Sequence, residues 1–301
     1  MVERYAAGFG PGTRFHSWSM AKSVTQALLA RRIQAGALAV ERPAPVPEWQ
    51  GPGDPRAALT LRNLLHMDSG LDNADGFGGD PADAFVARLL FSEGSRDVVA
   101  YAVAPPIVHP PGKRWAYSTA TTMILAGIVS RSVGGGKAGL RRFARDELFG
   151  PIGADSALLE FDAAGNFLGG GFVWARARDW ARFAYLYLRD GQWDGRRLLP
   201  EGWVDFSRTR APAGNNGNYG GHFWLNHPPK EGQPPQILPG GPPSAFAAVG
   251  NSGQYAMIVP THDLVLVRLG ELPSFEQWAD LTRALAEVVA AFPETTPEAA
   301  P

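Results

Sequence analysis

Residues 15–24 read FHSWSMAKSV, and this stretch places Ser19 three residues before Lys22. The chain has fourteen serines and four lysines in 301 residues, so random placement would give about 0.2 pairs with this spacing. An ordinary helix start with a solvated lysine would produce the same pattern. The spacing alone therefore does not separate a structural role from a chemical one, and the rest of the chain has to decide.

The chemistry open to this pair follows from helix geometry. Side chains three positions apart share a face, so the amine of Lys22 can reach the hydroxyl of Ser19. A serine becomes a good nucleophile only when a base takes its proton, and a lysine is a base only when burial keeps it neutral. Ser17 is a plausible N-cap of the helix, and the Ser19 N–H in its first turn could stabilise an oxyanion.

Composition limits the classes of protein that need to be considered. Apolar residues make up 45% and charged residues 19% of a chain with a net charge of −1, which is typical of a globular protein without a basic face for nucleic acid. The longest apolar runs are too short to span a bilayer. Cysteine is absent, which excludes disulfides, thiolate metal sites and a cysteine nucleophile. The histidines and carboxylates form no tight metal-binding pattern.

The first residues carry no signal-peptide pattern. The absence of this pattern favours a cytoplasmic protein, unless the N-terminus is incomplete. The segment MVERYAAGF, residues 1–9, is typical of one half of a hairpin.

Hydrophobic periodicity and turn residues divide the chain into a helical middle and a late sheet. Helices are expected after the serine motif, after a Thr60 cap, from Pro81, at 119–133, at 176–191 and, after a Ser274 cap, near the end. Strand-like segments occupy 219–226, 253–260 and 263–270, the last two as a hairpin. The pattern predicts an α+β fold, with an antiparallel β-sheet flanked by helices and a large helical insertion. We expect a discontinuous sheet domain at 1–35 and 206–301, and a mainly helical domain at 36–205.

Two further segments could complete a site around Ser19. The stretch RWAYSTATTM places Tyr117 in a loop just before a helix, where a phenol beside a lysine could relay a proton. In VGNSGQY, Gly250 and Gly253 let the backbone approach a ligand closely, and N–H groups near Asn251 could donate to an oxyanion.

In this order, the three segments resemble the serine β-lactamase-like hydrolases. That family includes class C β-lactamases, DD-peptidases, bacterial carboxylesterases and 6-aminohexanoate-dimer hydrolases. The resemblance also covers LTLRNLLHMDSGLD from residue 59, YSTATTMILAGIV from 117, the glycine run and helix at 169–204, and the two C-terminal strand segments. It implies a β-lactamase/transpeptidase-like fold and an acyl-enzyme mechanism, with Ser19 as nucleophile, Lys22 as base and Tyr117 as proton relay.

The chain departs from the family pattern at several positions. Asn251, Ser252 and Gly253 stand where penicillin-recognising members have Lys-Thr-Gly, so the cation for a β-lactam carboxylate is missing. Thr119 stands where the second motif often has asparagine. Eighteen residues precede Ser19, whereas family members usually have several dozen. This difference suggests a late start codon, a fragment or a shorter sheet.

The sequence therefore predicts a serine hydrolase of carboxylic esters or small linear amides that needs no metal or organic cofactor. The partner is a small-molecule substrate, with no nucleic acid and no membrane. The alternatives are a β-lactamase or DD-peptidase-like enzyme, and a catalytically silent penicillin-binding-like scaffold. The natural substrate and the oligomeric state stay open. Substrate contacts are expected from the third-motif residues and from aromatic pocket walls: Asn251, Ser252, Gly253, Trp18, Trp115, Trp174 and Phe223.

Overall fold

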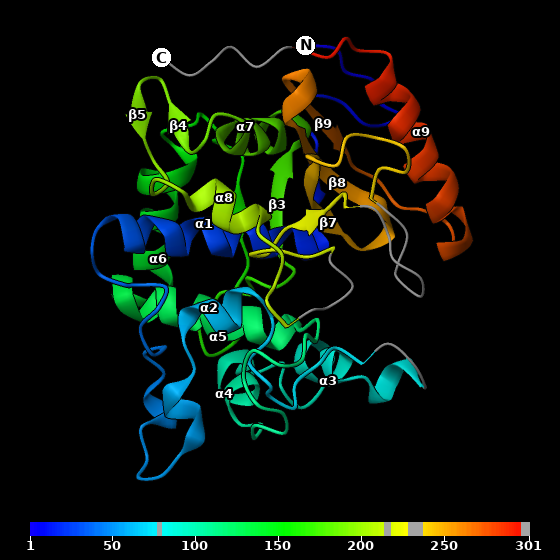
Figure 1. Ribbon diagram of the computed structural model, residues 1–301. Helices are drawn as coiled ribbons and strands as arrows, with labels where there is room; N and C mark the ends of the chain where they lie inside the picture. The colour runs from blue at the N-terminus through cyan, green and yellow to red at the C-terminus, as the bar shows by residue number, and fades with distance from the viewer. Residues whose placement is uncertain (77–79, 214–217, 228–236, 296–301) are drawn as a thin grey trace.

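The computed structural model describes residues 1–76, 80–213, 218–227 and 237–295. Figure 1 shows how its elements are arranged. Its α-helices are α1 (Ala21–Gln34), α2 (Leu61–Leu65), α3 (Phe85–Phe91), α4 (Val98–Val103), α5 (Thr119–Val133), α6 (Gly136–Ala144), α7 (Ala177–Leu188), α8 (Trp203–Arg208) and α9 (Trp278–Ala290). Its strands are β1 (Arg14–His16), β2 (Leu158–Leu159), β3 (Val173–Arg176), β4 (Gln192–Trp193), β5 (Arg196–Arg197), β6 (Trp224–Leu225), β7 (Phe246–Gly250), β8 (Gln254–Val259) and β9 (Leu264–Arg268).

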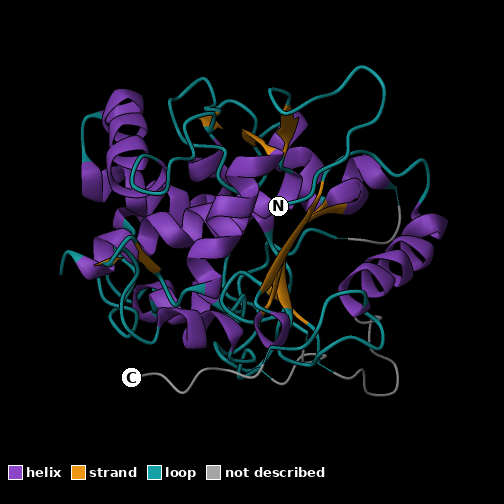
Figure 2. Ribbon diagram, turned by 90° about the horizontal axis from the view of Figure 1, so that it is seen from above, coloured by secondary structure: helices purple, strands orange, loops and turns teal. Residues whose placement is uncertain are grey.

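A four-stranded antiparallel sheet in the order β6-β7-β8-β9 separates two packing layers. Because side chains alternate along a strand, Ala247 and Met257 face α9 on one side of the sheet, while Ala248 and Ile258 face the main core. Helix α7 packs against β8 and β9 from that core side. Figure 2 shows the sheet between α9 and the larger helical body.

A second sheet, β1-β3-β2, delivers the chain to the serine motif. Phe15 pairs with Ala175, and the N–H of Ser17 donates to the carbonyl of Val173 at 2.9 Å. A 3₁₀ turn at Trp18–Met20 then leads into α1, whose first ten residues, 21–30, are all buried. The helix that carries Lys22 is therefore a central element, packed against α5 (Figure 1).

Local capping signals account for the helices around α1. The hydroxyl of Thr60 accepts from the N–H of Asn63, whose side chain returns a bond to the Thr60 N–H, so α2 begins with a capping box. Ser118 caps α5 through the N–H of Thr121, and Gly134 ends it with φ of 75°. These caps fix the start of α5, where Thr119 lies.

The predicted class, a mixed fold of helices and antiparallel sheet, is confirmed. Several local predictions were wrong. Residues 1–9 form no strand, and the first strand is β1, because pairing with β3 stabilises it. Ser17 makes no side-chain cap, since its hydroxyl is bonded to the β3 segment instead. Helix α9 begins at Trp278 after a 3₁₀ turn rather than at a Ser274 cap.

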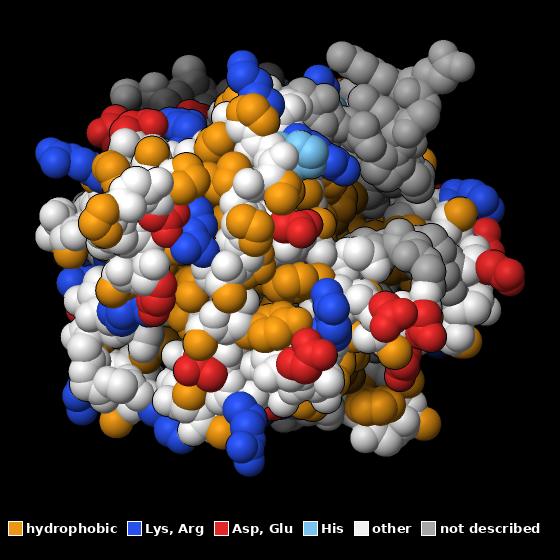
Figure 3. Space-filling view, turned by 90° about the horizontal axis from the view of Figure 1, so that it is seen from below, with side chains coloured by type: hydrophobic (Ala, Val, Ile, Leu, Met, Phe, Trp, Pro, Cys, Tyr) orange, Lys and Arg blue, Asp and Glu red, His pale blue; other side chains and the backbone are white. Residues whose placement is uncertain are grey.

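The division into a sheet domain and a helical domain remains a prediction. Helix α7 lies within the range expected to be helical but packs on the sheet. No helix in the described part of the chain is long and apolar enough to cross a bilayer. On the face shown in Figure 3, basic and acidic side chains are interspersed.

Candidate active site

Ser19 lies in the tight turn between β1 and α1 and is partly exposed. The residue before it, Trp18, has φ of 44°, a left-handed conformation that is uncommon outside glycine. Ser17 holds the turn in place, because its hydroxyl donates to the Gly171 carbonyl at 3.2 Å and accepts from the Val173 N–H at 3.0 Å. The backbone at the serine is thus fixed by bonds to a strand more than 150 residues away.

Lys22 is buried, with 2% of its surface exposed, and its ammonium group has three partners. Nζ donates to Ser19 Oγ at 3.2 Å, to Thr119 Oγ1 at 2.9 Å and to the carbonyl of Gly170 at 2.7 Å. Burial lowers the pKa of Lys22 to about 8, while the charge of Asp75 opposes this shift. With that pKa, about one-tenth of the lysine is neutral at pH 7 and can act as a base.

Tyr117 completes the contacts around the Ser19 hydroxyl. Its side chain is hydrogen-bonded to Ser19, and Lys22 Nζ lies 5.0 Å from the centre of its ring. Burial, and secondarily the charge of Asp75, raise the pKa of Tyr117 well above its usual value. The phenol is therefore protonated at neutral pH and can deliver a proton, which leaves Lys22 as the group that can accept one.

Asp75 is a buried carboxyl next to this cluster, and it is not among the site residues expected from the sequence. It accepts from the Thr119 N–H at 2.5 Å and from the Thr119 hydroxyl at 2.7 Å. Burial raises the pKa of Asp75, while Lys22 and the bonds from Thr119 lower it. The sequence signal, an aspartate in the loop DNADG, is common in turns and gave no reason to link it to Lys22.

The glycine run at 169–171 brings a backbone carbonyl to Lys22. A Cβ on Gly170 would lie 2.7 Å from Thr119 Cγ2, and one on Gly169 would overlap Thr25 Oγ1. Only glycine lets this segment pass so close to α1 and α5. In the sequence this run is part of the family resemblance, and its pattern alone indicates no role for it.

Aromatic rings lie on two sides of Ser19. On one side, Trp115, Tyr117, Tyr219 and Trp224 form a cluster in which Tyr117 lies 5.5 Å from Trp224, centre to centre. On the other side, His16 lies 4.6 Å from Trp18 and 4.9 Å from Trp174.

Three of the predicted wall residues, Trp18, Trp115 and Trp174, are thus half-buried beside the serine or its neighbours. The fourth, Phe223, is fully buried against Tyr187 and Phe246. Phe223 belongs to the core and cannot line a substrate pocket.

The predicted third motif lies in a turn. Asn251, Ser252 and Gly253 form a 3₁₀ turn between β7 and β8, not part of a strand. The carbonyl of Ser252 accepts from the N–H of Leu272 at 3.0 Å and from Arg268 at 3.1 Å, so this turn contacts the segment around β9.

Strand β7 itself packs beside the serine turn. A Cβ on Gly250 would overlap the carbonyl oxygen of Ser17. The backbone N–H of Asn226 donates to the Ala245 carbonyl. In an antiparallel pair, every second residue bonds to the same neighbour, so the backbone groups of Ala245, Ala247 and Val249 point toward β6. Val249 therefore presents its N–H to the same edge, beyond the end of β6. This N–H, two residues before Asn251, is a candidate second oxyanion donor beside those expected near Asn251.

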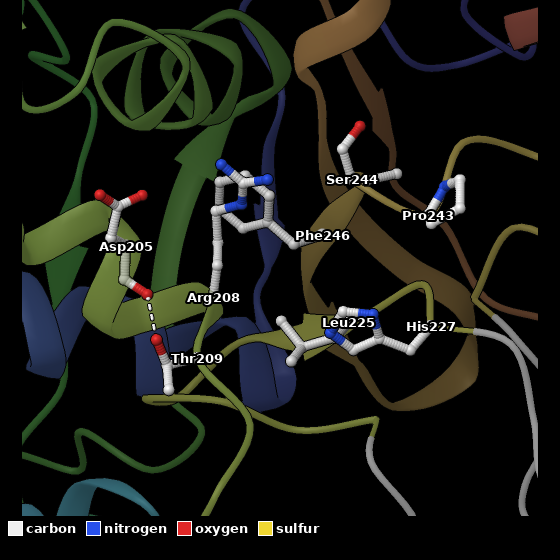
Figure 4. Close-up of a pocket in the computed structure, with 9 residues that line it drawn as sticks. Asp205, Arg208, Thr209, Leu225, His227, Pro243, Ser244 and Phe246 are labelled. Atoms are coloured by element: carbon white, nitrogen blue, oxygen red, sulfur yellow. Dashed lines mark hydrogen bonds between the residues drawn. The ribbon is translucent and has the colours of Figure 1, made fainter.

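Two observations concern other kinds of site. Within the described residues, no group of three or more His, Asp or Glu side chains could hold a metal ion. A hollow of about 360 Å³ is lined by residues of α8, β6, β7 and the adjoining loops, among them Arg208, Leu225 and His227 (Figure 4). Trp224 faces Tyr117 whereas the adjacent Leu225 lines the hollow, so the hollow lies on the other side of β6 from Ser19.

Comparisons with known proteins show the family and the fold. The profile of the family described as Beta-lactamase matches residues 2–290. The chain is 25% identical to a 6-aminohexanoate-dimer hydrolase from Paenarthrobacter ureafaciens, over 91% of this chain and 70% of that protein.

Two solved structures share the fold. One, from Bacillus anthracis and provisionally named a 6-aminohexanoate-dimer hydrolase, is 19% identical with a TM-score of 0.75, over 97% of this chain and 77% of that one. A structure from Mycobacterium bovis named a beta-lactamase is 20% identical with a TM-score of 0.67, over 94% and 88% of the two chains.

Proposed function

The chain belongs to the beta-lactamase family, and from that premise we propose that it is a serine hydrolase of carboxylic esters or small linear amides. One observation carries the proposal. Lys22 Nζ lies 3.2 Å from Ser19 Oγ, in a buried setting that lowers the pKa of Lys22 to about 8. A neutral lysine at that distance is the base that a serine nucleophile needs.

The acylation step uses groups that already touch one another. Ser19 Oγ forms a bond to the substrate carbonyl carbon as its proton passes to neutral Lys22. The carbonyl oxygen becomes an oxyanion, for which the N–H groups of Ser19 and Val249 are the candidate donors. When this intermediate collapses, the bond to the leaving alcohol or amine breaks. The leaving group takes a proton from Tyr117, which is replenished from Lys22.

Deacylation repeats the same proton transfers with water. Water attacks the acyl carbon as its proton passes through Tyr117 to Lys22, and Ser19 then leaves with a proton returned from the lysine. No charged cofactor enters either step. The two groups that exchange protons differ in the direction of their pKa shifts, since burial lowers that of Lys22 and raises that of Tyr117.

The substrate class is inferred from the walls of the site. In the aromatic cluster, the half-buried rings of Trp115, Tyr117 and Trp224 offer apolar surface near the serine, and Trp18 offers more. Strand β7, which passes the serine turn, reads FAAVG and has no charged side chain. Both features favour uncharged acyl groups. The similarity to a 6-aminohexanoate-dimer hydrolase adds linear amides to the candidates.

The test is the Ser19→Ala variant, assayed with short-chain p-nitrophenyl esters. We expect ester hydrolysis to be lost, by at least ~1,000-fold in kcat, with the circular dichroism spectrum and Tm nearly unchanged. A fluorophosphonate probe should label the wild-type protein at Ser19 and leave the variant unlabelled. Retention of most of the activity in the variant would contradict the serine mechanism. A folded wild-type protein with neither labelling nor turnover would instead be a catalytically silent scaffold.

A further inference from the structure

The steps proposed above leave Asp75 without a role, although it is connected to the base. Lys22 Nζ donates to Thr119 Oγ1 at 2.9 Å, and the Thr119 hydroxyl donates to Asp75 Oδ2 at 2.7 Å. The backbone N–H of Thr119 donates to the other carboxyl oxygen at 2.5 Å. Lys22, Thr119 and Asp75 are 2–3% exposed, so this chain of bonds is shielded from water.

The direction of these bonds is set by chemistry. A hydroxyl has one hydrogen, and Thr119 gives it to Asp75. The lone pairs of Thr119 Oγ1 are then turned toward Lys22, whose ammonium has donors only. A neutral lysine could rotate to point its own lone pair at Ser19 while it still donates to Thr119. The carboxylate thus orients the threonine, and the threonine orients the amine.

Asp75 is also the group best suited to supply negative charge here. The titratable groups that interact with Lys22 are Asp75, Tyr117 and His222, and Tyr219 interacts with the first two. Burial raises the pKa of both tyrosines and lowers that of His222 to about 3, so all three are neutral near pH 7. Burial raises the pKa of Asp75, and the charge of Lys22 and the two hydrogen bonds from Thr119 act against that shift by favouring the ionised carboxylate.

We propose that Asp75, acting through Thr119, is a positioning residue that orients Lys22 and stabilises its protonated form when Ser19 gives up its proton. This inference rests on the proposed function. No additional bond is made or broken, because the proton still moves from Ser19 Oγ to Lys22 Nζ. Thr119 stands where the resemblance leads one to expect asparagine, and its single hydroxyl both donates to the carboxylate and accepts from the amine.

The experiment measures kcat and kcat/KM of a p-nitrophenyl ester from about pH 6 to pH 10. For Asp75→Asn we expect kcat to fall at least ~10-fold with KM little changed. The acidic limb of kcat/KM should move at least ~1 unit lower, because the cationic lysine has lost its counter-charge. Thr119→Val should lower kcat and move the acidic limb in the same direction as Asp75→Asn. Thr119→Ser keeps the hydroxyl, so its pH profile should stay close to that of the wild-type protein.

Asp68→Asn is the matched control. Asp68 is an equally buried carboxyl in the same segment, but it is bonded to Asn63 rather than to Thr119. Its variant should keep the wild-type acidic limb. If Asp75→Asn does not fold, comparing Thr119→Val with Thr119→Ser tests the same hydrogen-bonded connection between Asp75 and Lys22.

The outcomes separate this inference from the proposed function. A wild-type protein without Ser19-dependent turnover would defeat the proposed function. If turnover depends on Ser19 but Asp75→Asn and Thr119→Val both keep the wild-type kcat and acidic limb of kcat/KM, the proposed function is retained. The role proposed for Asp75 is then wrong.

Discussion

At the residue scale, the base can be tested by keeping its charge and removing its ability to lose a proton. Arginine is not deprotonated near neutral pH, so Lys22→Arg separates base catalysis from simple electrostatic attraction. If Lys22 accepts the Ser19 proton, we expect Lys22→Arg to lose ester hydrolysis nearly as fully as Lys22→Ala. Both variants are assayed for kcat/KM after their folding is checked by circular dichroism. A substantially active arginine variant would make the lysine only an electrostatic partner.

The same lysine predicts how activity changes with pH. Burial lowers the pKa of Lys22 to about 8, and only the neutral amine can take a proton. Below about pH 8 the lysine is protonated, so kcat/KM should fall about tenfold for each pH unit. Above it, kcat/KM should level off. A pH-rate profile with a p-nitrophenyl ester, corrected for spontaneous hydrolysis, measures this limb. A profile flat from about pH 6 to pH 9 would exclude Lys22 as the titrating base.

The sequence identifies Ser19 and Lys22 by local spacing and Tyr117 by its place in a segment that resembles a family motif. Ser19 and Lys22 are three positions apart, so helix geometry alone predicts that they can meet. Asp75 and Gly170 lie 53 and 148 positions from Lys22, and their contacts exist only because the fold brings three segments together. Neither a single aspartate in a turn nor a run of glycines indicates from the sequence that these segments are in contact.

At the element scale, strand β7 passes so close to the serine turn that its last residue has no room for a side chain. A Cβ on Gly250 would overlap the backbone oxygen of Ser17, which cannot move without shifting Ser19. We therefore expect Gly250→Ala to lower stability by about 1–3 kcal/mol and to lower kcat. Gly12→Ala, where a Cβ would meet nothing within 4 Å, is the control. Thermal unfolding and ester hydrolysis measure the two effects. Wild-type values for Gly250→Ala would mean that β7 does not hold the serine turn.

Elements with strong local signals were the predictable ones. Helix α5 begins at a serine cap and ends at a glycine, and α7 follows from the spacing of its apolar residues. Strands β1 and β3 were missed because each has three or four residues and is stabilised by pairing across the chain. Of the two glycines that the sequence singles out for a close backbone approach, Gly250 lies against the serine turn and Gly253 lies against Arg268 and Leu272.

At the scale of the whole molecule, charge near the serine decides which substrates fit. Penicillins and cephalosporins carry a carboxylate beside the bond that is cleaved. In this chain β7 is uncharged, and Arg268, the nearest cation on the sheet to the turn after β7, is occupied by the carbonyls of Ser252 and Gly253. A carboxylate placed against β7 would lose water without gaining a cation from that strand, and a buried charge without a partner is costly.

We therefore expect short-chain p-nitrophenyl esters to be hydrolysed at least ~100-fold better, in kcat/KM, than a chromogenic cephalosporin. That ratio corresponds to about 2.7 kcal/mol of differential transition-state stabilisation, the size expected when one hydrogen bond to a charged group is missing. The comparison uses one enzyme preparation, with the Ser19→Ala variant as background for each substrate. A 6-aminohexanoate dimer, assayed alongside, separates esterase from amidase activity. A preference for the cephalosporin would mean that a cation outside β7 and β9 pairs with its carboxylate. The assignment to uncharged esters and amides would then be wrong.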